Sequence, residues 1–220
     1  MDEDLTQLWP VAGLRVVSGD LELRWPDDDL MVTVAREAGR GIHAPDAMPF
    51  TIPWSRGDCT TVSRNVLQYL WGQRSALTVD SWCLELAVLV DGLPIGLQSA
   101  RSARFPVTRT AETGSWLGQR HQGNGVGTRM RVLVLHLLFE GFGAREATSG
   151  AFLDNGPSNA VSTKLGYDRN GLVTVAREGV AAQQWRYRMD RERWDARPEW
   201  MRPVLTLHGV EPVREQLGIP

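Results

Sequence analysis

The chain has 220 residues, of which 42% are hydrophobic and 23% are charged, and its formal net charge is -2. These values suit one globular domain with short appendages, and the lack of a basic excess argues against nucleic acid as a partner. Two cysteines, Cys59 and Cys83, are too few for a disulfide framework and favour a reducing, cytoplasmic setting. The acidic opening MDEDLTQLWP does not resemble a signal peptide, and the apolar runs are too short to span a bilayer, so we expect no membrane partner.

The first predicted elements are a strand pair over residues 14–26, where LRVVSGDLELRWP alternates around a Ser-Gly-Asp turn. Residues 27–39 predict a helix, because aspartates offer N-caps at its start and Gly39 is a stop signal. A proline-rich loop follows over residues 41–58. Residues 59–77 then carry apolar side chains at helical spacing, which predicts a second helix.

Three strand-like runs come next, over residues 81–90, 93–103 and 108–118, and the Asp91-Gly92 pair between the first two is a strong hairpin signal. A mostly buried helix is expected over residues 126–143, ending at Gly141 or Gly143. The last elements are a strand over 145–153, a short helix over 155–167, and a closing strand pair over 172–178 and 183–194. This order predicts an α+β fold, with helices flanking a single mixed, mostly antiparallel sheet.

We expect one domain over residues 14–195, with an N-terminal extension over 1–13 and a C-terminal tail over 196–220. The tail contains one short apolar run, VLTLHGV, whose surroundings the pattern does not define. Its apolar residues are candidates for an interface in a homo-oligomer: Val204, Leu205 and Leu207.

A glycine-rich loop follows the third strand-like run and opens the apolar helix. Its residues are Gln122, Gly123, Asn124, Gly125, Val126, Gly127 and Thr128. Glycines let the backbone adopt positive φ and approach a ligand, while the amides of a helix N-terminus attract an anion such as a pyrophosphate. The spacing is not G-x-G-x-x-G and no Gly-Lys-Ser/Thr follows, which disfavours a dinucleotide fingerprint and a P-loop. The strands before the loop are predicted to be antiparallel hairpins, which also disfavours both nucleotide motifs. The alternative for the loop is a glycine-rich turn that binds no ligand.

Gln122-x-x-Gly125-x-Gly127 resembles the Q/R-x-x-G-x-G/A motif of the GNAT superfamily of N-acetyltransferases. GSWLG before the loop resembles the family's fourth strand, and Asn155-x-x-Ser158 with KLGY at residues 164–167 resembles the ending of the branch that acetylates ribosomal-protein N-termini. The resemblance covers residues 14–190. DAMPFTIPW, GSWLGQRHQGNGVGT and DNGPSNAVS are also similar to mycobacterial succinyltransferases of the same branch.

This resemblance implies a GNAT fold with a V-shaped splay between central strands and an acyl-CoA-dependent N-acyltransferase. Acetyl-CoA or succinyl-CoA would be the cosubstrate, and the loop residues 122–128 would bind it together with Trp116, Leu117, Asn155 and Ser158. The Leu117 backbone would be the oxyanion donor. Glu112 is the candidate general base, with an exposed strand glutamate as the alternative, and Ser158 is the candidate acid or sulfur contact. Arg129 and Arg131 are candidates for contact with the CoA phosphates, although many relatives have an acidic residue where Arg129 stands. Many relatives also have a tyrosine acid where Ser162 stands.

The acceptor side of the resemblance falls on the proline-rich loop, where His43, Met48, Phe50 and Trp54 are candidate substrate residues. An inert, proline-stiffened loop is the alternative. The acceptor is expected to be an amine on a protein, at its N-terminus or a lysine. A small-molecule amine and a non-catalytic CoA-binding module are the competing hypotheses. No His, Cys or Asp set has metal-ligand spacing, so no metal is expected.

Overall fold

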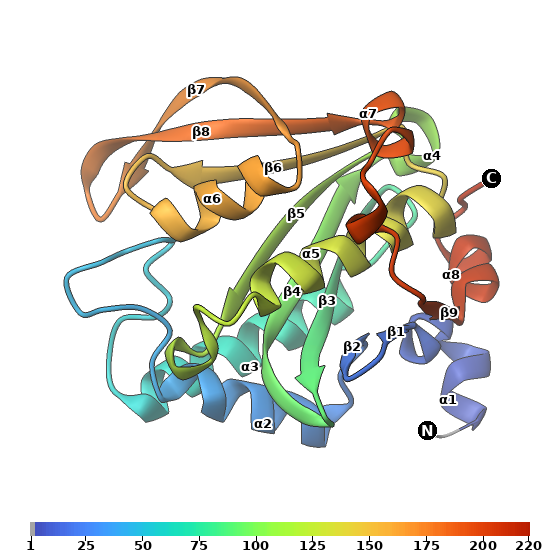
Figure 1. Ribbon diagram of the computed structural model, residues 1–220. Coiled ribbons are helices and arrows are strands. Elements are labelled where there is room, and N and C mark those ends of the chain that lie inside the picture. Colours follow the sequence, from blue (N-terminus) through green and yellow to red (C-terminus); the bar gives the residue numbers. More distant parts are fainter. Residues whose placement is uncertain (1–2) are drawn as a thin grey trace.

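The computed structural model describes residues 3–220, so Met1 and Asp2 of the expected N-terminal extension lie outside the described residues. Within that part of the chain, nine strands form one sheet in the order β7-β8-β6-β5-β4-β3-β2-β1-β9 (Figure 1). The strands are β1 (Arg15–Ser18), β2 (Leu21–Arg24), β3 (Ser81–Val90), β4 (Leu93–Ala103), β5 (Thr110–Leu117), β6 (Glu146–Phe152), β7 (Asp168–Arg177), β8 (Val180–Asp190) and β9 (Thr206–His208). The α+β fold with one mixed sheet is confirmed.

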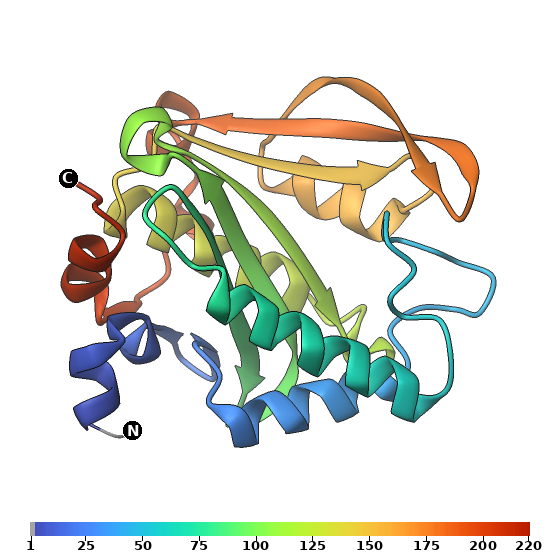
Figure 2. The same cartoon turned by 180° about the vertical axis from the view of Figure 1, so that it is seen from behind.

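Two layers of helices cover the two faces of this sheet. Figure 2 shows α2 (Asp28–Gly39) and α3 (Cys59–Ser75) on one face, while α5 (Val126–His136) and α6 (Gly156–Lys164) lie on the other. A separate apolar core lies between the sheet and each layer of helices. Shorter helices are α1 (Glu3–Leu8), α4 (Phe105–Thr108), α7 (Arg191–Asp195), α8 (Val210–Gln216), and the 3₁₀ turns 10–13, 119–121 and 199–201.

Local sequence signals account for the element boundaries. The Asp27 side chain accepts the amide of Leu30 and caps α2, as expected for an N-cap aspartate. Asp91 and Gly92 both have positive φ, at 49° and 78°, and form the two-residue turn of the β3–β4 hairpin. The predicted helix over 126–143 ends as a π-helical turn at residues 137–141. Asp190 caps α7, so the predicted strand 183–194 ends at residue 190 rather than continuing.

The C-terminal segment 196–220, which had no clear place in the sequence pattern, is part of the packed structure. β9 pairs antiparallel with β1, and Val213 and Leu217 at α8 are fully buried. The Gln216 side chain accepts the amide of Val11 at 3.0 Å, which ties the two ends of the chain together. Of the candidate interface residues, Leu207 packs against the main core while Val204 is 94% exposed.

One junction in the sheet is parallel, and it positions the site. β5 pairs with β4 along residues 112–117, but it pairs with β6 only at Thr110, Ala111 and Glu112. Beyond Glu112 the two strands separate, as both views show, and β6 continues its pairing with β8 instead (Figures 1 and 2). We call the diverging segments, residues 113–117 of β5 and 149–152 of β6, the splay.

Candidate active site

The glycine-rich loop lies at the open end of the splay and leads directly into α5. Gly123 and Gly125 have φ of 80° and 78°, in the left-handed region where a side chain is disfavoured. No described residue accepts a hydrogen bond from the backbone amides of residues 123–127. These amides surround the positive end of the α5 dipole, which carries about half an elementary charge. The loop therefore has the geometry of an anion-binding site suited to a pyrophosphate.

Gln122 holds this loop in place through its side-chain amide. The Gln122 Nε2 group donates to the carbonyl oxygens of Ile42 at 2.6 Å and Leu117 at 2.8 Å. It therefore links the end of β5 to the segment that follows α2. The side chains of Val126 and Thr128 are buried, and the Thr128 amide donates to Gly125, so their contribution to a ligand would come mainly from the backbone.

The Leu117 amide faces the splay. Leu117 lies opposite Gly96, and the next amide, that of Gly118, donates to Ile95 O at 2.9 Å. In an antiparallel ladder this arrangement makes Leu117 and Gly96 a non-hydrogen-bonded pair, so the Leu117 N–H points away from β4. It points into the space between β5 and β6, where a donor for an oxyanion would have to lie.

Glu112 lies at the closed end of the splay, on the face covered by α2 and α3. Its carboxylate pairs with Arg101 on β4 at 2.9 Å and with Arg186 on β8 at 3.3 Å, and its side chain is 25% exposed. The floor beyond it is made of small residues, because Gly114 faces Ser99 and Gly150 lies beneath the Arg186 guanidinium. Glu112 is therefore a partly accessible carboxylate that is held by two cations and has small residues beside it.

The loop between α2 and α3, residues 40–58, is fastened to the β7–β8 hairpin, and we call it the roof loop. Arg56 binds both carboxylate oxygens of Glu178, at 2.8 and 3.1 Å, across 122 positions of sequence. Arg177 on β7 contacts Met48 O at 3.5 Å, and Met48 itself is buried. The roof loop thus extends from the α2–α3 layer to the β7–β8 hairpin (Figure 2).

An aromatic row links the roof loop to β5. The Phe50 and Trp54 ring centroids are 4.8 Å apart, and Trp54 is 5.9 Å from Trp116. His43 lies 6.1 Å from Phe50 and bonds the Ser55 hydroxyl at 2.7 Å. The structure therefore brings His43, Phe50, Trp54 and Trp116 together on the face of Glu112. The Trp116 side chain lies on this face and not on the face of α5.

The Asn155 and Ser158 pair begins α6, next to α5. Asn155 Oδ1 accepts the Ser158 amide at 3.2 Å, so Asn155 is the N-cap of this helix. The Ser158 hydroxyl is half-buried and forms no hydrogen bond with a described residue, which leaves it available to a ligand. Gly127 on α5 approaches Val161 on α6, so the N-terminal turns of the two helices lie close together.

Sequence reasoning missed one charged residue in this region. Glu37 on α2 is buried and accepts hydrogen bonds from Arg40 at 2.9 Å and Arg120 at 2.6 Å. Burial raises the pKa of Glu37, but the hydrogen bonds from Arg40 and Arg120 outweigh it and leave this pKa below its ordinary value. His121, which precedes the loop, also lies 3.3 Å from Glu37.

Arg131 on α5 is one of the two arginines expected to contact the CoA phosphates. It is 4% exposed and reaches the splay, where it contacts Ser115 and Ser149. Arg129, the other candidate for contact with the CoA phosphates, pairs with Asp20 at the β1–β2 turn.

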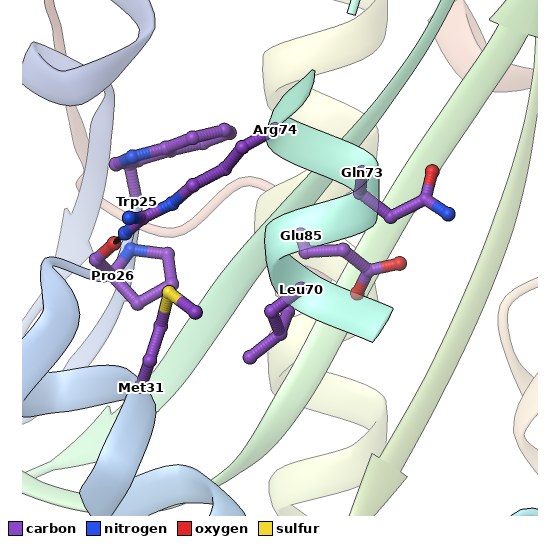
Figure 3. Close-up of a pocket in the computed structure, with 7 residues that line it drawn as sticks. All are labelled: Trp25, Pro26, Met31, Leu70, Gln73, Arg74 and Glu85. Carbon is purple, nitrogen blue, oxygen red and sulfur yellow. Dashed lines mark hydrogen bonds between the residues drawn. The ribbon is translucent and has the colours of Figure 1, made fainter. Parts of the chain in front are cut away.

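A small cavity lies elsewhere, between α2, α3 and the end of β2, and does not belong to the site. Figure 3 shows Arg74 stacked over Trp25 beside Pro26 and Met31. Its volume is about 10 Å³, which is room for about one water molecule. Among residues 3–220, no group of three His, Cys, Asp or Glu side chains could hold a metal ion, and no helix is long and apolar enough to cross a membrane.

Comparison with known proteins identifies the class of this fold and site. Residues 20–168 match the family model described as the acetyltransferase (GNAT) domain. The chain therefore belongs to the GNAT acetyltransferase family and is an acyl-CoA-dependent N-acyltransferase, as the sequence motifs predict.

Solved structures share the same fold at low sequence identity. Mycobacterium smegmatis RimJ in complex with CoA-disulfide is 21% identical, with a TM-score of 0.67 over 84% of this chain and 89% of RimJ. RimL, a ribosomal alpha-N-protein acetyltransferase in complex with coenzyme A, is 19% identical, with a TM-score of 0.63 over 80% of this chain and 97% of RimL. The microcin self-immunity acetyltransferase MccE, in complex with acetyl-CoA and AMP, is 17% identical, with a TM-score of 0.59 over 78% of this chain and 92% of MccE.

Proposed function

We propose that this enzyme transfers an acyl group to the amine of a protein, at its N-terminus or at a lysine, by direct attack within a ternary complex. The observation that supports this proposal is the splay, which has loop amides without an acceptor among the described residues at its open end and Glu112 at its closed end. A cosubstrate bound at the loop would enter the splay from the α5 face. An amine would approach from the opposite face, beneath the roof loop.

The site residues on the two faces of the sheet would then have different roles. The amides of residues 123–127 would hold the pyrophosphate, while Asn155 positions Ser158 beside the pantetheine arm. The Leu117 N–H would donate to the thioester oxygen as negative charge develops there. Glu112 would accept the proton of the attacking amine, directly or through one water.

The charges around Glu112 support succinyl rather than acetyl as the transferred group. Two guanidinium groups, Arg101 and Arg186, share the single carboxylate of Glu112. A second carboxylate, on the far end of a succinyl group, would complete this cluster through charge-assisted hydrogen bonds. It would also draw one arginine away from Glu112 and leave that carboxylate freer to take a proton. An acetyl group has no charge with which to do either.

The roof loop supports a peptide acceptor. Its aromatic row, with Phe50, Trp54 and Trp116, lies on the same side of the sheet as Glu112. Such a row offers contact area for residues that follow an amine along a chain. RimJ and RimL share the fold with this chain, and RimL is a ribosomal L7/L12 alpha-N-protein acetyltransferase.

The test is a thiol-release assay with acetyl-CoA and succinyl-CoA against peptide N-termini, lysine peptides and small amines. We expect turnover of a peptide amine with succinyl-CoA preferred. Arg101→Met and Arg186→Met should each reduce that preference about tenfold, because one charge-assisted hydrogen bond contributes about 1.5 to 3 kcal/mol. Arg188→Met is the matched control, since Arg188 pairs with Glu146 two residues further along β8. An acetyl preference in the wild type would refute the donor assignment.

Glu112→Gln tests the general base. We expect kcat to fall by about 10²-fold, the typical contribution of such a group, with CoA affinity retained. If the pH–rate profile of Glu112→Gln matches that of the wild type, Glu112 is not the base. If CoA binds and no amine is acylated, the chain is a CoA-binding module and the proposed function fails.

A further inference from the structure

Arg131 is a buried cation for which the described residues provide no counter-ion. Its Nη1 group donates to Ser149 Oγ at 3.0 Å and its Nη2 group to Ser115 Oγ at 3.2 Å. Its Nε is also buried and has no hydrogen-bond partner among the described residues. No described carboxylate lies within ion-pair distance of it, whereas Arg101, Arg129 and Arg186 each pair with one.

Burying the charge of Arg131 in this way costs free energy unless a negative charge lies nearby. Arginine remains protonated in proteins, and a buried charge is ordinarily paired because its removal from water is unfavourable. Two serine hydroxyls satisfy part of the hydrogen-bonding capacity of Arg131, but they carry no net charge. The fold therefore maintains a fixed positive charge inside the site.

The position of the guanidinium group decides which anion could use it. Ser115 on β5 and Ser149 on β6 stand on opposite sides of the splay, just beyond the last paired residues. Arg131 bridges them from α5, the helix whose N-terminus carries the glycine-rich loop. It therefore lies on the cofactor side of the splay, whereas an acyl chain and its acceptor would extend toward Glu112 on the other face.

We propose that Arg131 stabilises the negative charge that develops on the CoA sulfur as the thioester breaks; this rests on the proposed function. The amine nitrogen bonds to the carbonyl carbon, the C–S bond breaks, and its electron pair passes to sulfur. The amine proton goes to the general base, and CoA leaves as a thiolate that takes a proton from solvent after release. A dedicated proton donor to sulfur is then unnecessary, which suits a chain with Ser162 where many relatives have a tyrosine.

The ionisation of bound CoA tests this role without turnover. The cysteine thiol titrates at about 8.5, and the thiol of free CoA, which lacks the neighbouring peptide groups of cysteine, titrates above that value. We expect the CoA thiol bound to wild-type enzyme to ionise about one pH unit lower, read from thiolate absorbance, so that CoA affinity rises about tenfold as pH increases past both values. CoA lacking its sulfur atom should show no such rise.

Arg131→Met should abolish the shift, and Arg131→Lys should retain most of it because the charge is preserved. Arg129→Met is the matched control, since Arg129 is on the same helix but pairs with Asp20 at the surface. If Arg131→Met does not fold, Arg131→Gln, which keeps the polar shape, replaces it. If the bound CoA thiol ionises at the same pH in the wild type and in the neutral variant, the proposal is wrong.

Two further results separate the possible failures. If neutral variants weaken succinyl-CoA relative to acetyl-CoA while the bound thiol titrates unchanged, Arg131 binds an acyl carboxylate and the thiolate role is wrong. If the thiol shift is present and depends on Arg131 but no amine is acylated, the proposed function fails while the charge assignment stands.

Discussion

Replacing Glu37 by glutamine should loosen the end of β5 with little change in shape. The Glu37 side chain is 2% exposed and accepts hydrogen bonds from Arg40 Nη1 at 2.9 Å, Arg120 Nη2 at 2.6 Å and Arg120 Nε at 3.0 Å. Its Oε1 atom lies so close to Gly118 that a Cβ there would come within 2.3 Å. Glu37 therefore anchors the turn from which the glycine-rich loop continues.

The expected loss of stability follows from these contacts. A hydrogen bond involving a charged group contributes about 1.5 to 3 kcal/mol, so two guanidinium partners suggest about 3 to 6 kcal/mol. The side chains of Arg40 and Arg120 are 59% and 53% exposed, however, so water replaces much of what they lose. We expect Glu37→Gln to lower the free energy of unfolding by about 2 to 3 kcal/mol at neutral pH.

The pH dependence distinguishes this mechanism from simple loss of packing. The pKa of Glu37 is below its ordinary value of 4.5 in the folded chain. The unfolded state therefore binds more protons in this range, and the stabilisation is complete above 4.5 and is lost as pH falls through the folded pKa. The difference between wild type and Glu37→Gln should shrink in acid.

Urea unfolding at a series of pH values from neutral to acid measures this difference. Glu211→Gln is the matched control, because Glu211 also pairs with an arginine but is 76% exposed, and it should change stability by less than about 1 kcal/mol. A Glu37→Gln effect that stays constant across the acid range would refute the charge-based reasoning.

Three further changes test the surrounding geometry. Gly125→Ala should lower the free energy of unfolding by about 1 to 2 kcal/mol, because φ is 78° at this residue, and calorimetry should show weaker CoA binding. Gly156→Ala is its control, because φ is not positive at Gly156 and an added Cβ would meet open space. Gln122→Met should weaken CoA binding by about tenfold, since it leaves two carbonyl groups unpaired at the loop, and unchanged affinity would contradict that role. Arg56→Met should raise KM for the acceptor without changing CoA affinity, and an equal effect on both would show that the roof loop serves the whole site.

Local patterns predicted the parts of the site that neighbouring residues determine. Gly123 and Gly125 occur where the backbone needs positive φ, and Asn155 stands where a helix needs a cap. The Asp91-Gly92 turn set the register of the β3–β4 hairpin in the same way. Each of these features depends on a few consecutive residues, so the sequence contains the necessary information.

Features that depend on distant residues were not predictable from one sequence. The roof loop is placed by Arg56 and Glu178, which are 122 positions apart, and the residues around each of them do not indicate this contact. The tail gave no sign that β9 would pair with β1 at the other end of the chain. The sequence offered Glu112 as a candidate general base, with an exposed strand glutamate as the alternative, but its pairing with Arg101 and Arg186 depends on the register of three strands.

The topology explains why cofactor loop, splay and buried charge occur together. β5, α5 and β6 form a βαβ unit within an otherwise antiparallel sheet, so the loop opens such a unit although the strands before it are antiparallel. A parallel pair requires a helical crossover, and that crossover begins where β5 ends, beside the widest part of the splay. Its first amides then face one end of the opening, and a residue little more than one turn further along the helix can reach between the strands. Arg131 occupies that position, four residues after Gly127, so one helix presents both the anion-binding amides and the fixed positive charge to the same bound molecule.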